Sequence, residues 1–287
     1  MFEKILIATD LSPASDFLVQ CPADLKTIGM KQSVLAHVVY VANTPGLEVL
    51  LEEKAKPQLE RQKGLLEQQG IEVKIALELG IPTQDLSDLA ERHDVAAILI
   101  GSRGLGLARS ALGGVSFKLL QITRRPVFLS RMNILGEGDQ CRLSVCRRPF
   151  ENILFPTDFS DTSERAFAYV ENIARESRPA VTLLHVLEDQ HTTHLSRQGI
   201  KELKSLDIRR LEEMQQRLER LGSQVVIEWT SGSPGKEIVN LSREGHYSLV
   251  VMGNQGKGFF REALFGSVAN EVARAAEIPV LFIPAVR

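Results

Sequence analysis

The chain contains two copies of one sequence pattern, and this duplication limits how it can fold more than any other feature. Residues 4–12 match residues 152–160, because an aliphatic run is followed in both by Thr-Asp-x-Ser. The same offset of 148 residues places residues 35–38 (Leu-Ala-His-Val) on residues 183–186 (Leu-Leu-His-Val). With 287 residues, the chain is long enough for each copy to bury its own hydrophobic core. Two similar domains in tandem are therefore predicted.

Each copy alternates short Val-, Ile- and Leu-rich runs with stretches that have the 3.6-residue period of a helix. Such runs, bounded by Gly and Pro, are typical of a parallel sheet that helices cover on both faces. In the second copy the pattern predicts strands at about 152–157, 180–187, 224–230, 247–253 and 279–284, and helices at about 161–177, 197–221, 235–245 and 267–276. In both copies, Asp-x-Ser supplies N-cap chemistry for the first helix. The predicted fold class is α/β.

The domain boundaries follow from the repeat. The first domain is predicted at residues 1–131, the linker at 132–149 and the second domain at 150–287. The linker contains Gly-Glu-Gly-Asp, is mildly basic and lacks apolar periodicity, so a partly ordered connection is expected there.

Composition argues against several classes of protein. The net charge of −2 and a pI near 6.3 give no electrostatic case for binding nucleic acid. No apolar run approaches the roughly 20 residues that span a bilayer, so no membrane partner is expected. Three cysteines do not make a disulfide framework, and the first ten residues resemble a strand rather than a signal peptide. A cytoplasmic location is therefore expected.

A glycine-spaced segment near the C-terminus is the strongest candidate for a binding site. Gly253 and Gly256 follow a predicted strand, and nine residues later Gly266-Ser267 opens a predicted helix. Glycine lets the backbone approach a ligand closely, and a helix start directs free N–H groups and the positive end of its dipole at the same place. The spacing predicts a phosphate site. A role of the glycines as turn residues alone is the alternative.

Further candidate groups lie where the predicted strands end, which is where open α/β sheets bind ligands. The Asp158 carboxylate can accept hydrogen bonds from a sugar or a base, and it can equally cap the following helix. The backbone of Val186 can offer one donor and one acceptor to a flat heterocycle. Lys257 and Arg261 are candidate phosphate partners, or solvated loop charges.

The histidines favour structural roles. His37 and His185 lie at equivalent positions in apolar strands, which predicts a hydrogen-bonded structural histidine in each copy. His191 and His194 have a spacing that a metal could use, but no Cys or carboxylate motif accompanies them. No metal site is predicted.

Both halves resemble universal stress protein domains, and the chain resembles a tandem universal stress protein over nearly all its length except the linker. The nucleotide-binding subgroup of that family carries Gly-x-x-Gly, nine residues, and then Gly followed by Ser or Thr. Gly253, Gly256, Gly266 and Ser267 match this pattern in full. The resemblance implies, for each domain, a five-stranded parallel sheet of order 3-2-1-4-5 with helices on both faces.

The resemblance also implies a ligand, ATP or AMP, with or without Mg²⁺, and no catalytic residue. By resemblance, the nucleoside would be flanked by Pro156, Thr157 and Asp158, and the adenine would meet Val186. The phosphates would be held by Gly253, Gly256, Gly266, Ser267 and Val268.

The first copy departs from the family pattern. Its weaker equivalents of the site residues are Thr9, Asp10, Val38, Gly101, Gly104 and Gly114. One residue is missing after Gly104, so either Gly113 or Gly114 can stand where Gly266 stands. In both alternatives the hydroxyl of Ser267 is lost. Weaker or absent nucleotide binding is therefore predicted for the N-terminal domain.

The leading functional hypothesis is a cytoplasmic stress-response regulator that binds an adenine nucleotide mainly in its C-terminal domain. The alternatives are a slow ATP hydrolase or phosphotransferase, and a partner-binding module without nucleotide. Catalysis is disfavoured because the glycine segment offers no obvious general base, and the nearest carboxylates in sequence, Asp161 and Glu262, belong to no motif. The sequence identifies no protein partner.

The resemblance bears on assembly as well, because isolated domains of this family often dimerise through their last strands. An unpaired edge strand seeks a partner, so the two copies are expected to pair within the chain, residues 127–129 beside residues 280–283. Further homodimerisation remains open.

Overall fold

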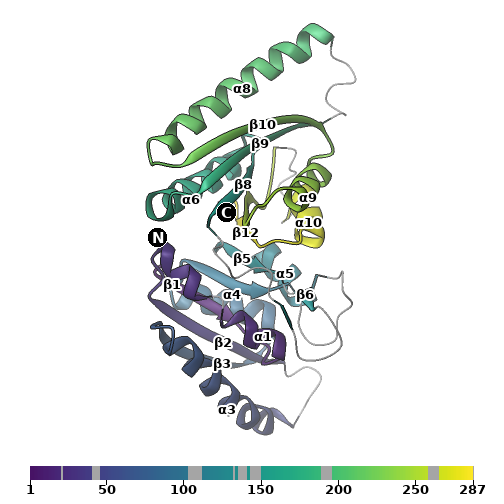
Figure 1. Ribbon diagram of the computed structural model, residues 1–287. Coiled ribbons are helices and arrows are strands. Elements are labelled where there is room, and N and C mark those ends of the chain that lie inside the picture. Colours follow the sequence, from purple (N-terminus) through teal and green to yellow (C-terminus); the bar gives the residue numbers. More distant parts are fainter. Residues whose placement is uncertain are drawn as a thin grey trace. The chain divides into compact units, whose positions relative to one another are not determined.

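The computed structural model describes residues 1–20, 22–40, 46–102, 112–131, 133–134, 141–142, 150–188, 196–257 and 265–286 (Figure 1). The chain divides into two compact units, Met1–Arg147 and Arg148–Val286. Each unit is an α/β domain built around a parallel sheet, which confirms the predicted fold class.

The N-terminal unit has the strand order β5-β4-β1-β2-β3, and each neighbouring pair is parallel. This is the expected 3-2-1-4-5 arrangement. The strands are β1 (Lys4–Ala8), β2 (Gln32–Tyr40), β3 (Glu72–Gly80), β4 (Ala97–Gly101) and β5 (Val127–Ser130). The helices are α1 (Pro13–Leu18), α2 (Pro22–Leu25), the 3₁₀ helix η1 (Lys26–Ile28), α3 (Glu48–Glu67), α4 (Pro82–Arg92) and α5 (Gly114–Ile122).

The C-terminal unit repeats this order as β10-β9-β8-β11-β12, again with parallel neighbours. Its strands are β8 (Asn152–Pro156), β9 (Ala180–Glu188), β10 (Gln224–Gly232), β11 (Leu249–Gly253) and β12 (Val280–Ile283). Its helices are α6 (Asp161–Ser177), α8 (Arg197–Glu219), α9 (Pro234–Glu244) and α10 (Ser267–Ala275). The nine elements predicted for this copy are confirmed, with ends that move by two residues or fewer.

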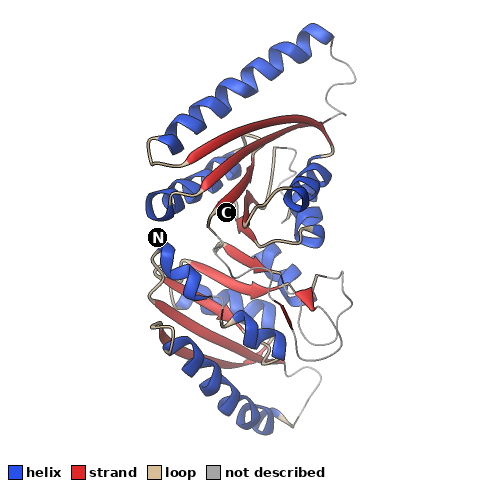
Figure 2. Ribbon diagram, in the orientation of Figure 1, coloured by secondary structure: helices blue, strands red, loops and turns tan. Residues whose placement is uncertain are grey.

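Helices cover both faces of each sheet (Figure 2). In the C-terminal unit α6 and α8 pack on one face and α9 and α10 on the other; in the N-terminal unit α1 and α3 oppose α4 and α5. Burial from both sides explains why central strands read as continuous apolar runs: residues 153–156 of β8 and 249–252 of β11 are buried.

The first helix of each unit starts in the same way. Ser12 and Ser160 are the N-caps of α1 and α6, and each side-chain oxygen accepts a hydrogen bond from a backbone N–H three residues on. The preceding residues, Leu11 and Phe159, have φ near 60°. This conformation is uncommon for residues with a side chain and turns the backbone sharply between strand and helix.

The first helix of the N-terminal unit is broken where α6 is continuous. The segment equivalent to the 17 residues of α6 is divided into α1, α2 and η1. Pro22 is the first residue of α2, and proline in a helix interior removes an N–H donor and clashes with the preceding turn. The new helix thus starts at Pro22, although proline does not always have this effect, since Pro57 lies inside the continuous helix α3.

The linker contains a small antiparallel pair, β6 (Asn133–Ile134) with β7 (Cys141–Arg142). The rest of residues 135–149 lies outside the described residues. Among the helices that the structure describes, none is both long and apolar enough to cross a membrane.

Candidate functional site

The glycine segment ends at the start of α10, whose N-terminus carries no side-chain cap. Gly266 is the N-cap, with φ −68° and ψ 154°, and within the described residues no side-chain capping bond is made there. Its own N–H donates to the Asn254 carbonyl at 2.8 Å. The first N–H groups of α10 and the positive end of its dipole are therefore directed at the space in front of the helix.

Asn254, which the sequence did not single out, fixes this segment in place. It is buried, its N–H donates to the Ile283 carbonyl at 2.9 Å, and its Oδ1 accepts from the Ala285 N–H at 3.1 Å. Together with the bond from Gly266, these contacts tie the end of β11 to both α10 and β12. The sequence signal for this role was a polar residue between Gly253 and Gly256.

Asp158 joins the end of β8 to the glycine segment. Its Oδ2 accepts the Lys257 backbone N–H at 2.8 Å, and its Oδ1 accepts both the N–H and the hydroxyl of Ser160, at 3.0 and 2.6 Å. A Cβ atom at Gly256 would lie 2.6 Å from Oδ2. Only glycine therefore lets the loop approach the carboxylate this closely.

The Thr157 backbone and side chain hold the turn that carries Asp158. The Thr157 Oγ1 accepts from the Phe159 N–H at 3.0 Å and from the Ser163 hydroxyl at 2.8 Å. The Thr157 N–H donates to the Leu184 carbonyl at 2.8 Å, and its carbonyl lies 2.7 Å from Nδ1 of His185. The prediction of a hydrogen-bonded structural histidine is confirmed for His185.

Val186 has backbone groups that are directed toward the same turn. Along a strand, backbone hydrogen-bonding groups alternate between the two neighbouring strands. The Leu184 carbonyl bonds to Thr157 on the β8 side, so Val186, two residues further, faces that side too. Because β8 ends at Pro156, the Val186 N–H and C=O point beyond its end.

The structure thus gathers most of the predicted site residues of this unit at the carboxyl ends of β8, β9 and β11. Pro156, Thr157 and Asp158 form the turn, Gly253 ends β11, and Ser267 and Val268 are the first two residues of α10. Arg261, Glu262, His191 and His194 lie outside the described residues. Within the described residues, His, Cys, Asp and Glu form no group of three or more that could hold a metal ion.

The N-terminal unit decides between the two placements of its shortened glycine segment. Gly113 is the N-cap of α5, with φ −62° and ψ 143°, and its N–H donates to the Ser102 carbonyl at 2.8 Å. These are the features of Gly266 in the other unit. Gly113 is therefore its counterpart, and Gly114 stands where Ser267 stands, without a hydroxyl. Gly104 lies outside the described residues.

Asp10, the counterpart of Asp158, is held by the start of α1. Its Oδ1 accepts the Ser12 N–H at 3.1 Å and the Ser12 hydroxyl at 2.6 Å, and it also accepts the Ser15 hydroxyl. In the C-terminal unit the equivalent Ser163 bonds to Thr157 instead. The carboxylate of the N-terminal unit thus has one more local donor.

His37 also has the predicted structural role, since its Nδ1 lies 2.9 Å from the Thr9 carbonyl. Burial lowers the pKa of His37 below its usual 6.5, while the bond to Thr9 and the charge of Asp10 act in the opposite direction. The unfolded chain therefore binds this proton more readily than the folded chain. The resulting stabilisation is present above pH 6.5 and is lost as the pH falls through the lowered pKa.

We expect the urea concentration at the unfolding midpoint of the N-terminal unit to decrease when the pH is lowered from 7 to 5, partly because of His37. His37→Gln should reduce this fall, since an amide does not titrate and can still donate to the Thr9 carbonyl. Urea unfolding of both proteins at the two pH values measures the difference. An unchanged pH dependence in the variant would contradict the assignment.

Comparisons with known proteins agree with the fold. The family model described as the universal stress protein family matches residues 1–131 and 149–284. A universal stress protein of Mycolicibacterium smegmatis is 25% identical over 306 residues, an alignment that covers 97% of this chain and 96% of that protein. Universal stress protein MJ0531 of Methanocaldococcus jannaschii is 32% identical over 139 residues, which cover 47% of this chain and 82% of the relative.

A solved structure of a universal stress protein from Archaeoglobus fulgidus has the same fold. It matches with a TM-score of 0.77 at 23% identity, covering 98% of this chain and 96% of that one. The duplicated parallel sheet and a family model that matches both halves lead to one assignment: the chain belongs to the universal stress protein family.

Proposed function

We propose that this protein binds an adenine nucleotide in its C-terminal unit and acts as a nucleotide-dependent regulator in a stress response. One observation carries the proposal: the uncapped start of α10 and the Asp158 carboxylate are held by the same short glycine segment. A phosphate group suits the first of these and a ribose hydroxyl suits the second. Membership of the family supports the stress-response part.

The residues present fit such a ligand. The N–H groups at Ser267 and Val268 have the position and the dipole to hold phosphate oxygens. Gly256 leaves room for close approach beside Asp158, whose carboxylate accepts hydrogen bonds from ribose hydroxyls. The backbone of Val186 would meet the adenine with one donor and one acceptor. A bound nucleotide would supply the phosphate charge that this arrangement compensates.

We assign the N-terminal unit a weaker site or a structural role. Gly114 gives no hydroxyl at the start of α5, and the Asp10 carboxylate already accepts two hydroxyl groups. One nucleotide per chain is therefore the expected stoichiometry.

Isothermal titration of the full chain with ATP and with AMP, each with and without Mg²⁺, tests the proposal. One site per chain supports it, no binding of either nucleotide rejects it, and two equal sites contradict the difference between the units. A phosphate-release assay under the same conditions separates a regulator from a slow ATP hydrolase.

Ser267→Ala should weaken ATP binding modestly. The change removes one hydroxyl, worth about 0.5–1.5 kcal/mol, or up to about 3 if its partner is a charged phosphate. The α10 helix should remain intact, because Ser267 is exposed and alanine is the better helix former. Titration gives the affinity and thermal unfolding provides the control. Affinity equal to that of the wild type would show that the hydroxyl does not contact the ligand.

A further inference from the structure

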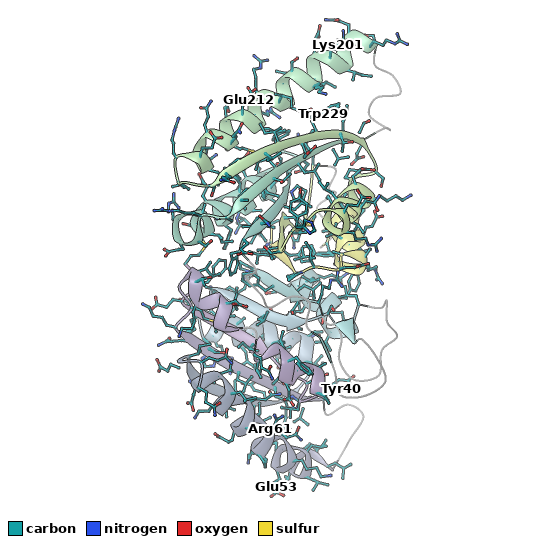
Figure 3. All side chains as sticks on the ribbon, viewed as in Figure 1. Tyr40, Glu53, Arg61, Lys201, Glu212 and Trp229 are labelled. Atoms are coloured by element: carbon teal, nitrogen blue, oxygen red, sulfur yellow. The ribbon has the colours of Figure 1, made fainter. Side chains whose placement is uncertain are left out.

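A partly buried chain of polar side chains links α8 and the edge strand β10 to the turn that carries Asp158. The Nε2 of His185 lies 3.4 Å from Oδ2 of Asp207, on α8, while its Nδ1 lies 2.7 Å from the Thr157 carbonyl. The indole N–H of Trp229, on β10, donates to the same Asp207 oxygen at 3.4 Å. The side chains of His185 and Asp207 are only 10% and 13% exposed. Figure 3 labels Trp229 on the strand that α8 covers.

The N-terminal unit has the same histidine, but its described residues include no counterpart of these two partners. His37 lies 2.9 Å from the Thr9 carbonyl, as His185 does from Thr157. Directly across from it on the neighbouring strand is Leu77, where His185 has Trp229. The indole donor is thus absent from the equivalent position.

The carboxylate is absent from that position too. Asp207 lies four residues before Leu211, which is fully buried against the sheet. Ala55 lies four residues before the fully buried Leu59 of α3 and is itself buried. Within the described residues, the polar chain therefore occurs only in the unit that also has the complete glycine motif.

Packing and helix formation alone do not explain Asp207. Alanine is the better helix former, and Ala55 fills the equivalent place in α3. A largely buried carboxylate is costly unless hydrogen bonds compensate it. What Asp207 does provide is a carboxylate 3.4 Å from the far nitrogen of His185, an ion-pair partner for the protonated ring, in which both nitrogens carry a proton and Nδ1–H donates to the Thr157 carbonyl.

A second contact joins the helix to the turn. The His185 ring packs on the Phe159 ring with centroids 4.7 Å apart. The guanidinium of Arg210, on α8, lies 5.2 Å from the Phe159 centroid, and the Lys257 ammonium lies 5.4 Å from it. Phe159 is thus in contact with both α8 and the glycine segment.

We propose that Asp207 and Trp229 are positioning residues of the nucleotide site. They hold His185 so that it donates to the Thr157 carbonyl, and this fixes the turn that places the Asp158 carboxylate against the Lys257 N–H. The proposal deepens the proposed function and rests on it.

Hydrogen exchange of the full chain without nucleotide tests the positioning directly. Asp207→Ala installs the residue of the N-terminal unit and should speed exchange at Phe159, Ser160 and Lys257 about tenfold, a typical effect of losing a hydrogen bond. The equivalent turn of the N-terminal unit should not change. Asp207→Asn keeps an acceptor oxygen and should stay within about twofold of the wild type. Glu212→Ala, an exposed change on the same helix, is the matched control.

If the Asp207→Ala protein exchanges at the wild-type rate in the turn that carries Asp158, the positioning role is overturned, whether or not the protein binds ATP. Exchange that rises equally in Glu212→Ala would overturn it as well, since the effect would then be general to α8.

Titration with ATP separates this proposal from the proposed function. The wild type should bind, with a change in the emission of Trp229, the single tryptophan of the chain, and Asp207→Ala should bind about tenfold more weakly. Equal affinity in the two proteins would overturn the positioning role. Faster exchange in the turn together with no ATP binding by the wild type would support the positioning and reject the ligand.

Discussion

Gly266→Val is expected to lower the affinity for ATP by at least about a hundredfold, equivalent to about 3 kcal/mol. An N-cap side chain lies over the N–H groups of the first helical turn, because polar caps bond to those groups from this position. A branched aliphatic group there would occupy the phosphate space and could not satisfy the N–H donors. The backbone at Gly266, with φ −68° and ψ 154°, is open to valine, so the unit should still fold.

The N-terminal unit supplies the matched control. Gly113 is the N-cap of α5 with nearly the same backbone angles, so Gly113→Val makes the same chemical change outside the proposed site. Its affinity for ATP should equal that of the wild type. Isothermal titration measures both variants, and circular dichroism checks that both fold. If Gly266→Val binds ATP with wild-type affinity, the assignment of the phosphate site to the start of α10 is wrong.

The α/β fold was predictable because its signals are local and repeated. Buried parallel strands read as apolar runs in the sequence. Ser160 predicts the start of α6, and the structure has it as the N-cap of that helix. The duplication added a second, independent instance of each element. The break between α1 and α2 could have been anticipated from Pro22.

The composition of the candidate site was less predictable. The sequence permitted either Gly113 or Gly114 to match Gly266, because a single deletion inside a loop has no unique position. The choice depends on where the α5 helix begins, and the hydrogen bond from Gly113 to Ser102 fixes that point. Such a bond joins residues on two sides of a loop and leaves no pattern in the sequence.

Asp207 and Trp229 were missed for a related reason. Asp207 lies in a long charged segment that fits a solvent-facing amphipathic helix. Trp229 lies in a strand, and the residues of a strand do not show which other strand it pairs with. Only the register between β9 and β10 places Trp229 beside His185. A comparison of the two copies offers a signal: Asp207 and Trp229 stand where the first copy has Ala55 and Leu77.

Gly256→Ala is expected to weaken ATP binding roughly thirtyfold, about 2 kcal/mol. The new Cβ would lie 2.6 Å from Oδ2 of Asp158, a distance at which one of the two must move. The carboxylate cannot turn away freely, because it accepts hydrogen bonds from Ser160 and from the Lys257 N–H. The loop would be displaced instead, and with it the backbone that is proposed to face the phosphates.

A double-mutant cycle with Asp158→Ala identifies the cause of this loss. Asp158→Ala alone should weaken binding, because it removes both the proposed ribose partner and the anchor of Lys257. With the carboxylate gone, the added methyl group of Gly256→Ala has space. In the Asp158→Ala background, Gly256→Ala should therefore lower the affinity for ATP by less than about threefold. Additive losses would show that Gly256 serves the ligand directly, by close backbone approach. A coupling of about 1 kcal/mol or more would show that this glycine exists to let Asp158 reach the loop.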